Sequence, residues 1–212
     1  MATLPGCNLL PETQNYELTL NMSVDGLVHS ASVVQQVHCH KGVGAFGGMD
    51  AGGCYVNGEA LPLDLGKRGK IFLILRDGPR RVGTPGRTLG DVEKMVWHLG
   101  IGGDDRVRNR KCWTPAMDRL PAFVAFQDRN DPKTVVQVDP DNLQPAFGDR
   151  VTFDNLWVCR TSKPVTRGRI ERELPWLTRM GMKGRSSQLD GGFGQILGGP
   201  ISQWFSKIDF ER

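Results

Sequence analysis

The stretch Tyr16-Glu17-Leu18-Thr19-Leu20-Asn21-Met22-Ser23-Val24-Asp25-Gly26 decides the fold of this chain. Its apolar residues occupy every second position from Tyr16 to Val24, which is the period of a strand with one buried face. Asp25-Gly26 follows directly and tolerates the positive φ angles of a tight turn, so residues 27–37 are expected to run back antiparallel. The sequence therefore predicts that the fold opens with a long β-hairpin.

Similar patterns continue after this hairpin. Residues 55–65 read as a further hairpin that turns at Asn57-Gly58, and a second reversal at 66–69 leads into the apolar strand 71–75. Further strands are expected at 122–126, 134–138 and 151–159. Consecutive strands joined by short turns favour an antiparallel meander.

Helical signals are few. Val92, Met95, Val96 and Leu99 lie at helical spacing and predict a helix over 89–99. Asp139-Pro140 has the composition of a helix start, which predicts a short helix that reaches Phe147 and ends at Gly148. One helical turn is expected over 174–180. The predicted class is α+β: a mostly antiparallel sheet with one or two helices packed on one face.

Length and composition indicate a globular domain. The chain has 212 residues, 39% of them hydrophobic and 24% charged, and a chain of this length buries a substantial core. We expect a linker at 1–14 and one domain at 15–212, with a glycine-rich loop at 41–53 and a loop-rich segment at 181–203. The apolar residues near the end are expected to dock on the core: Trp204, Phe205, Ile208 and Phe210.

The charge pattern argues against a nucleic-acid partner. The net charge of +4 is dispersed along the chain, and the dense basic cluster 106–111 is flanked by Asp104 and Asp105, as in a solvated loop. No nucleic-acid-binding motif accompanies it. No apolar run approaches the ~18–20 residues that cross a membrane as a helix, so membrane attachment would be covalent or peripheral.

Leu4-Pro5-Gly6-Cys7 resembles the acylation motif of a bacterial lipoprotein. This pattern predicts that Cys7 carries a lipid, and Asn8 after it favours the outer membrane. The basic start and apolar run of a secretion signal do not precede it. The alternative is a short disordered amino terminus with an incidental cysteine.

The other cysteines, Cys39, Cys54, Cys112 and Cys159, allow three pairings into two disulfides. We favour Cys39 with Cys54, which closes the glycine-rich segment, and Cys112 with Cys159. Both would form in an oxidising compartment such as the periplasm.

Several blocks of the chain resemble a family of uncharacterised lipoproteins from alphaproteobacteria and their relatives. The first block is Asp131-Pro132-Lys133-Thr134-Val135-Val136-Gln137-Val138-Asp139-Pro140-Asp141-Asn142-Leu143 with Ala146-Phe147-Gly148. The second combines Pro164-Val165-Thr166, Gly168-Arg169-Ile170-Glu171 and Leu174-Pro175-Trp176-Leu177, and the opening hairpin and residues 58–66 are similar too. The resemblance implies a lipid anchor but no activity. This chain differs from the family in its four extra cysteines and in the glycine-rich insert after His40.

Motifs that would carry chemistry are incomplete. His38 and His40 are candidate metal ligands beside Cys39 and Cys54, but strand alternation points both histidines away from Cys39, so we expect a disulfide with exposed histidines and no metal. The glycines of 42–47 match a dinucleotide fingerprint without the helix that must follow it, so we expect no cofactor. No Gly-x-Ser-x-Gly motif is present.

These observations favour a non-catalytic lipoprotein of the periplasm or cell surface, anchored to the outer membrane, that binds a protein partner in the envelope. An immunity or inhibitor protein and an accessory subunit of an envelope assembly are specific forms of this hypothesis. Trp113, and Phe46 in the glycine-rich loop, are the predicted partner contacts, with Trp113 expected to be exposed. The alternative is a periplasmic hydrolase whose site is not recognisable from sequence.

Overall fold

The computed structural model describes residues 12–40, 53–77, 99, 101, 110–179, 195–196, 199–200 and 210–211. Several predictions lie outside these residues. They are the Cys7 motif, the loop at 41–52 with Phe46, the helix at 89–99 apart from Leu99, most of the segment 181–203, and the docking of Trp204, Phe205 and Ile208.

The long opening hairpin is confirmed. Strand β1 (Glu12–Val24) pairs with β2 (Leu27–His40), and Val24 lies opposite Leu27 across the turn. Asp25 and Gly26 both have positive φ, at 50° and 83°, as a two-residue hairpin turn requires. The alternating apolar residues of β1 are all buried: Tyr16, Leu18, Leu20, Met22 and Val24.

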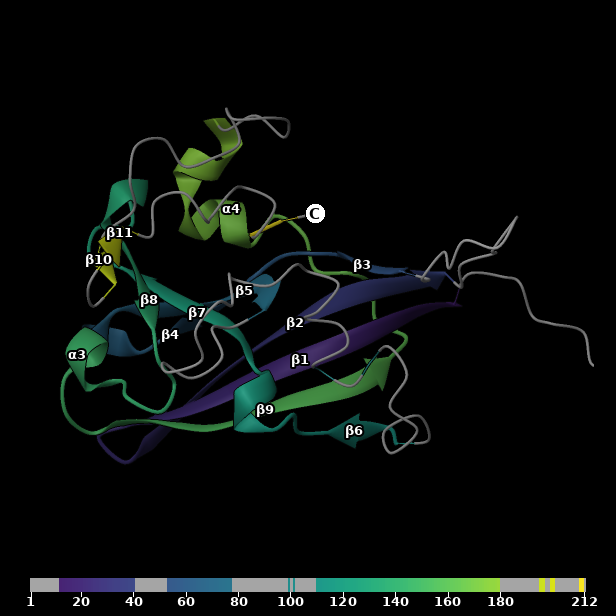
Figure 1. The fold of residues 1–212 in the computed structure, drawn as a ribbon, viewed down its shortest axis with the longest axis horizontal. Helices are drawn as coiled ribbons and strands as arrows, with labels where there is room; N and C mark the ends of the chain where they lie inside the picture. The colour runs from purple at the N-terminus through teal and green to yellow at the C-terminus, as the bar shows by residue number, and fades with distance from the viewer. Residues whose placement is uncertain are drawn as a thin grey trace, which may run out of the picture.

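This hairpin forms the centre of a five-stranded antiparallel sheet in the order β3-β2-β1-β9-β6 (Figure 1). Strand β3 (Gly53–Asn57) is added beside β2, and β9 (Val151–Thr161) lies beside β1. The short strand β6 (Cys112–Trp113) pairs with β9. Strands that are distant in sequence therefore become neighbours of β1 and β9.

A second antiparallel sheet has four strands in the order β4-β5-β7-β8. They are β4 (Leu61–Asp64), β5 (Lys70–Asp77), β7 (Pro121–Phe126) and β8 (Val135–Val138). The reversal before β5 is made by the 3₁₀ turn η1 (Gly66–Arg68), as predicted.

The predicted hairpin at 55–65 is wrong, because β3 and β4 belong to different sheets. After Gly58 the chain does not return along β3. Instead Glu59 pairs with Glu211, and the backbone N–H of Ala60 donates to the carbonyl of Phe210 at 2.7 Å. The residues after Gly58 thus pair with residues 210–211 and not with β3, and the chain goes on into the second sheet.

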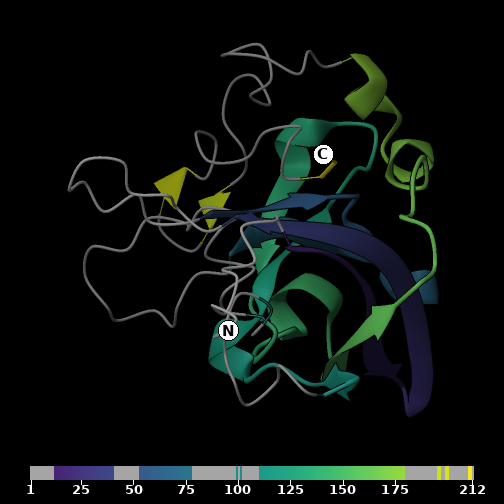
Figure 2. The ribbon, with the colours of Figure 1, turned by 90° about the vertical axis from the view of Figure 1, so that its right-hand side faces the viewer.

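The structure has three layers, in which the four-stranded sheet lies between the five-stranded sheet and a helical layer (Figures 1 and 2). Alternate residues of β5, such as Ile71 and Leu73, pack in the core between the sheets. Phe72 and Ile74 pack on the other side against α4 (Ile170–Glu173) and the 3₁₀ turn η4 (Pro175–Arg179). This double burial explains why β5 is apolar at consecutive positions. Phe210 is fully buried in the second core, as predicted.

The remaining elements are short. Helix α3 (Gln144–Phe147) ends at Gly148, whose φ is 77°, as predicted. Its predicted start at Asp139 is wrong, because Asp139 accepts the backbone N–H groups of Asp141 and Asn142 and so forms a turn. The 3₁₀ turns η2 (Met117–Arg119) and η3 (Pro132–Thr134) and the pair β10 (Gln195–Ile196) and β11 (Gly199–Pro200) complete the described elements.

The α+β class, with largely antiparallel strands and two helices, is confirmed. The two helices do not share a face, because α3 places Phe147 in the core between the sheets and α4 places Ile170 in the second core. Within the described residues, none of the helices has the length and apolar character that a membrane-spanning helix needs.

Candidate functional site

The side of the five-stranded sheet that points away from the four-stranded sheet carries a row of polar side chains. Because Leu18, Leu20 and Met22 of β1 face the core, the residues between them face outward, together with their neighbours in register on β2 and β9. We call this surface the open face. It consists of Thr19, Asn21, Ser23, Val28, Ser30, Ser32, Thr152, Asp154, Asn155 and Trp157.

The polar side chains of the open face bond to one another across the strands. Three hydrogen bonds join Thr19 to Ser32 at 2.8 Å, Asn21 to Asn155 at 2.7 Å and Ser23 to Asp154 at 2.7 Å. The register of β1 and β9 shifts between Asn21 and Met22, and Ser23 reaches Asp154 in this irregular stretch. Cross-strand pairs of this kind stabilise a sheet and hold its surface groups in fixed positions.

Trp157 is the aromatic residue of the open face. It lies opposite Thr19, next to the end of β6, and its side chain is 42% exposed. An exposed indole offers a large rigid surface together with one hydrogen-bond donor, and tryptophan is enriched at the energetic centres of protein interfaces. Asp154 carries the one formal charge of the open face.

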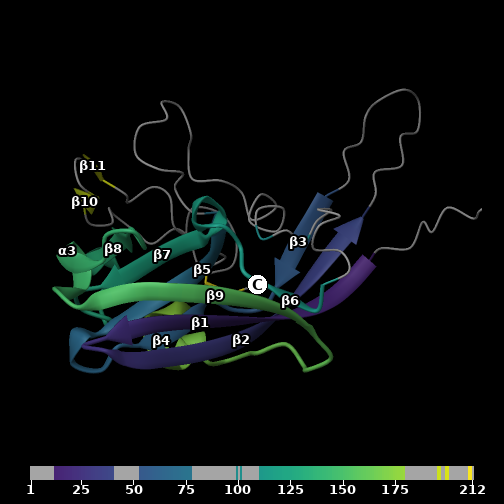
Figure 3. The ribbon, with the colours of Figure 1, turned by 90° about the horizontal axis from the view of Figure 1, so that it is seen from below.

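A neighbouring part of the same sheet side is covered by residues 162–169, which we call the strap. The backbone N–H of Thr166 donates to the carbonyl of Val34 on β2 at 3.0 Å, and the N–H of Val34 donates to the Thr166 hydroxyl at 2.8 Å. Lys163 pairs with Glu17 on β1 at 2.6 Å. Val34 is accordingly buried although it faces outward. Figure 3 shows β9, β1 and β2 side by side on the near side of the molecule, with no described segment drawn across the open face.

Both favoured disulfides, Cys39–Cys54 and Cys112–Cys159, are present. Each joins residues that lie directly opposite each other on neighbouring strands, with a Cα–Cα distance of 4.1 Å. They fasten β3 and β6, the two outermost strands of the five-stranded sheet. Two disulfides indicate an oxidising compartment outside the cytoplasm.

The prediction that Trp113 is exposed is wrong. Trp113 lies opposite Val158, a residue that faces the core, and is only 5% exposed. Its indole N–H donates to the carbonyl of Leu99 at 2.6 Å, and its ring meets that of Tyr16 edge-on at 6.0 Å. The polar sequence around Trp113 suggested a loop, but pairing with β9 turns this side chain inward.

Sequence reasoning missed Trp157 because it stands between two other apolar residues, Leu156 and Val158. Those two are buried, so the alternation of β9 points Trp157 to solvent. Strand alternation was the available signal, but it needs the register of β9 on β1 to decide which side is buried.

The candidate metal ligands do not converge. The ring of His38 hydrogen-bonds to Thr13 at 2.8 Å and to Gln36 at 2.7 Å, and it stacks on Tyr55 with 4.7 Å between centroids. His40 lies at the end of β2 opposite Gly53, and both nearby cysteines form a disulfide. In the part of the chain that the structure describes, no three His, Cys, Asp or Glu residues are grouped to hold a metal ion.

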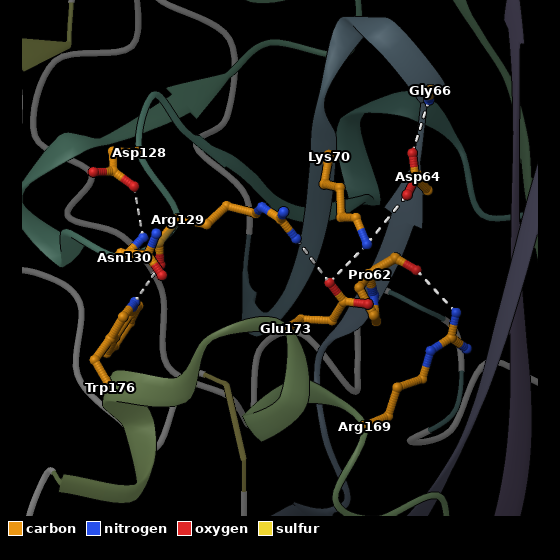
Figure 4. Close-up of polar contacts among 10 residues, drawn as sticks. All are labelled: Pro62, Asp64, Gly66, Lys70, Asp128, Arg129, Asn130, Arg169, Glu173 and Trp176. Carbon is orange, nitrogen blue, oxygen red and sulfur yellow. Dashed lines mark hydrogen bonds and ion pairs between the residues drawn. The ribbon is translucent and has the colours of Figure 1, made fainter.

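A cluster of four charged side chains joins the helical layer to the four-stranded sheet (Figure 4). Lys70 contacts Glu173 at 2.7 Å and Asp64 at 3.2 Å, and Arg129 contacts Glu173 at 3.2 Å. Burial acts to lower the pKa of Lys70, but its bonds to Glu173 and Asp64 outweigh burial and raise the pKa above its usual 10.5. For Asp64, burial acts to raise the pKa, and the Gly66 N–H and Lys70 hold it below its usual 3.8.

This charged cluster has a structural role. Each of its charges lies against an opposite one, so its groups are occupied with one another. Arg129 also accepts the indole N–H of Trp176 on its backbone carbonyl at 2.9 Å. The cluster thus binds the turn after β7 to α4 and η4, and the open face remains the candidate functional site.

Comparison of the chain with models of protein families, with curated proteins and with solved structures finds no match. The resemblance to the lipoprotein family therefore stays a prediction.

Proposed function

We propose that this chain is a lipid-anchored protein of the bacterial envelope that binds a protein partner through the open face and has no catalytic role. The observation that carries the proposal is the combination of an exposed Trp157 with a rigid, almost uncharged polar surface. Depletion of charge and enrichment in large aromatic side chains distinguish the centres of protein interfaces from the rest of a surface.

The polar contacts of the open face favour binding over catalysis. Ser23 donates its hydroxyl hydrogen to Asp154, whereas an activated serine needs an adjacent base, usually histidine, that is itself oriented by a third group. The other contacts join hydroxyl to hydroxyl and amide to amide. Such groups recognise a partner by hydrogen bonding.

The envelope location is supported by the two disulfides and by the Cys7 motif. We propose that a lipid on Cys7 holds the protein at the outer membrane. An immunity or inhibitor protein, or an accessory subunit of an envelope assembly, would need a binding surface of this kind.

Site-specific photo-crosslinking in the native host tests the binding surface. A photoreactive amino acid at Ser30, an exposed residue of the open face, is expected to give a discrete covalent adduct with an envelope protein. The same group at Asp118, which is exposed on η2, should give none. In the Ser30 background, Trp157→Ala is expected to reduce the adduct at least about tenfold, as the loss of an interface hot spot does.

Tyr55→Ala is the matched control, because Tyr55 is an aromatic residue of similar exposure on the edge strand β3, outside the open face. It should leave the Ser30 adduct unchanged. An adduct that is equally strong with Trp157→Ala, or equal adducts from Ser30 and Asp118, would contradict the proposed surface.

The anchor is tested separately with the natural full-length gene. Cys7→Ser is expected to move the protein from the membrane fraction to the soluble fraction, with the mass of an acyl group lost. An unmodified Cys7 in the native protein would refute the anchor without bearing on the open face.

A further inference from the structure

The two disulfides lie in different surroundings, although they have the same cross-strand geometry. Cys54 is 3% exposed and belongs to the core between the sheets, and the partly buried Cys39 packs against that core. Cys112 is exposed and Cys159 is half-buried. Cys159 lies opposite Glu17 on β1, whereas its neighbour Val158 faces the core, so Cys112–Cys159 is on the solvent side of the sheet.

Exposure decides whether an external thiol can reach a disulfide. Exchange proceeds by attack of a thiolate along the S–S axis, so a sulfur that is covered by core side chains reacts only after the structure opens. Glu17, which lies opposite Cys159 on the same side of the sheet, has its carboxylate paired with Lys163, so its negative charge is compensated where an anionic thiolate would approach.

We propose that Cys112–Cys159 is a thiol-exchange site whose co-reactant is a dithiol of the envelope. A thiolate of the dithiol attacks Sγ of Cys112, the more exposed sulfur, to form a mixed disulfide. The bond between the two cysteines breaks, and Cys159 leaves as a thiolate. The second thiolate of the co-reactant then attacks the co-reactant's first sulfur, which is bonded to Sγ of Cys112 in the mixed disulfide. Cys112 leaves as a thiolate. The dithiol is oxidised to a disulfide, and this protein is reduced by two electrons and takes up two protons.

Exchange at this site would remove the covalent link between β6 and β9 and leave the fold in place. Strand β6 has only two residues, and apart from the disulfide it is held by its pairing with β9, which the Arg160 N–H to Lys111 carbonyl bond extends at 2.8 Å. The buried Trp113 is the other attachment. Cys39–Cys54 is expected to stay oxidised under the same conditions, because it is covered by the core.

The test uses the oxidised full chain under native conditions, with dithiothreitol as the probe. Thiols that are released are trapped with N-ethylmaleimide and mapped by peptide mass spectrometry. Cys112 and Cys159 are expected to become labelled about tenfold faster or more than Cys39 and Cys54, in keeping with the dependence of exchange on access. Equal rates for the two disulfides, or faster opening of Cys39–Cys54, would overturn the proposal.

Two further measurements separate direct exchange from unfolding. The labelling rate should rise in proportion to dithiothreitol concentration, whereas a rate that reaches a plateau set by unfolding would refute direct attack. The variant with Cys112→Ser and Cys159→Ser should lose the fast phase, and the variant with Cys39→Ser and Cys54→Ser should keep it.

Glutathione, which has one thiol, identifies the attacked sulfur. The adduct is expected on Cys112, and an adduct mainly on Cys159 would overturn the assigned direction of attack. None of these measurements depends on the proposed partner, so their outcome is independent of the function of the open face.

Discussion

The buried carboxylate of Glu59 accepts a hydrogen bond from the backbone N–H of Ile170, at 3.2 Å, and so caps the start of α4 from another part of the chain. Both of its oxygens also accept the N–H of Arg169, at 3.2 and 3.0 Å. Arg169 precedes the helix and gives it no side-chain cap of its own. Glu59 is only 2% exposed, so its carboxylate meets these two N–H groups away from solvent.

Glu59→Ala is expected to destabilise the protein by about 2–4 kcal/mol, because it leaves two N–H groups without their acceptor in a buried place. Glu59→Gln keeps one acceptor oxygen and should cost less. Urea unfolding followed by circular dichroism measures both changes. Glu171→Gln, on the same helix, is the control and is expected to change the free energy of unfolding by less than about 0.5 kcal/mol. Equal losses from Glu59→Gln and Glu171→Gln would contradict the capping role.

Gly58→Ala is expected to be more damaging than Gly26→Ala. Gly58 has a φ of 149°, and an added Cβ would lie 3.2 Å from Cγ and 3.3 Å from Cα of Gln35, which is buried. Strain and contact together should cost about 2–3 kcal/mol. Gly26 has a φ of 83° with open space around it, so strain alone should cost about 1 kcal/mol. Thermal unfolding of the two variants compares their stabilities directly. A larger loss of stability for Gly26→Ala would show that the space between Gly58 and Gln35 has room for a side chain.

Several of the elements that sequence predicted correctly are decided by neighbouring residues. The β1–β2 hairpin follows from alternation and from Asp25-Gly26, and the end of α3 follows from Gly148. The Cys39–Cys54 disulfide follows from two cysteines that flank one loop. In each case the partner lies close in the chain, so the local pattern contains the needed information.

The errors at Gly58, Trp113 and Trp157 have a common physical cause, which is pairing between distant segments. Asn57-Gly58 signals a reversal whether the chain returns to the same sheet or crosses to another. Here the backbone of Ala60, just after the reversal, bonds to the distant Phe210. The inward side of Trp113 and the outward side of Trp157 depend on the register of β9 with β6 and β1. Alternation gives the two sides of a strand, but only the distant partner decides which side is buried.

Lys70→Met is expected to weaken stability by about 1–2 kcal/mol at neutral pH, since Lys70 makes charge-assisted bonds from a largely buried position. The pKa of Asp64 is lowered on folding, so its contribution is present above pH 3.8 and is lost as the pH falls through its folded-state value. The pKa of Lys70 is raised, so its contribution is present below pH 10.5 and is lost as the pH rises through its folded-state value.

The urea concentration at the midpoint of unfolding should therefore fall less steeply in Lys70→Met than in the parent protein, both as the pH is lowered into the acid range and as it is raised into the alkaline range. The control is Lys163→Met, which removes an ion pair from a lysine that is 61% exposed and should cost less than about 1 kcal/mol. Identical pH profiles for the parent and Lys70→Met would show that the cluster does not couple protonation to folding.

The contrast between Trp113 and Trp157 gives the most direct check of the sheet register. Trp113→Ala removes a buried ring from beside Tyr16 and is expected to cost about 3–5 kcal/mol. Trp157→Ala removes a ring that is 42% exposed, and surface truncations of this kind usually change stability by about 0.5 kcal/mol or less. Trp113→Phe keeps most of the ring but loses the bond to the Leu99 carbonyl, so it should fall between the two. Urea unfolding of the three variants ranks them, and a larger loss for Trp157→Ala than for Trp113→Ala would mean that β9 presents its opposite side to the core.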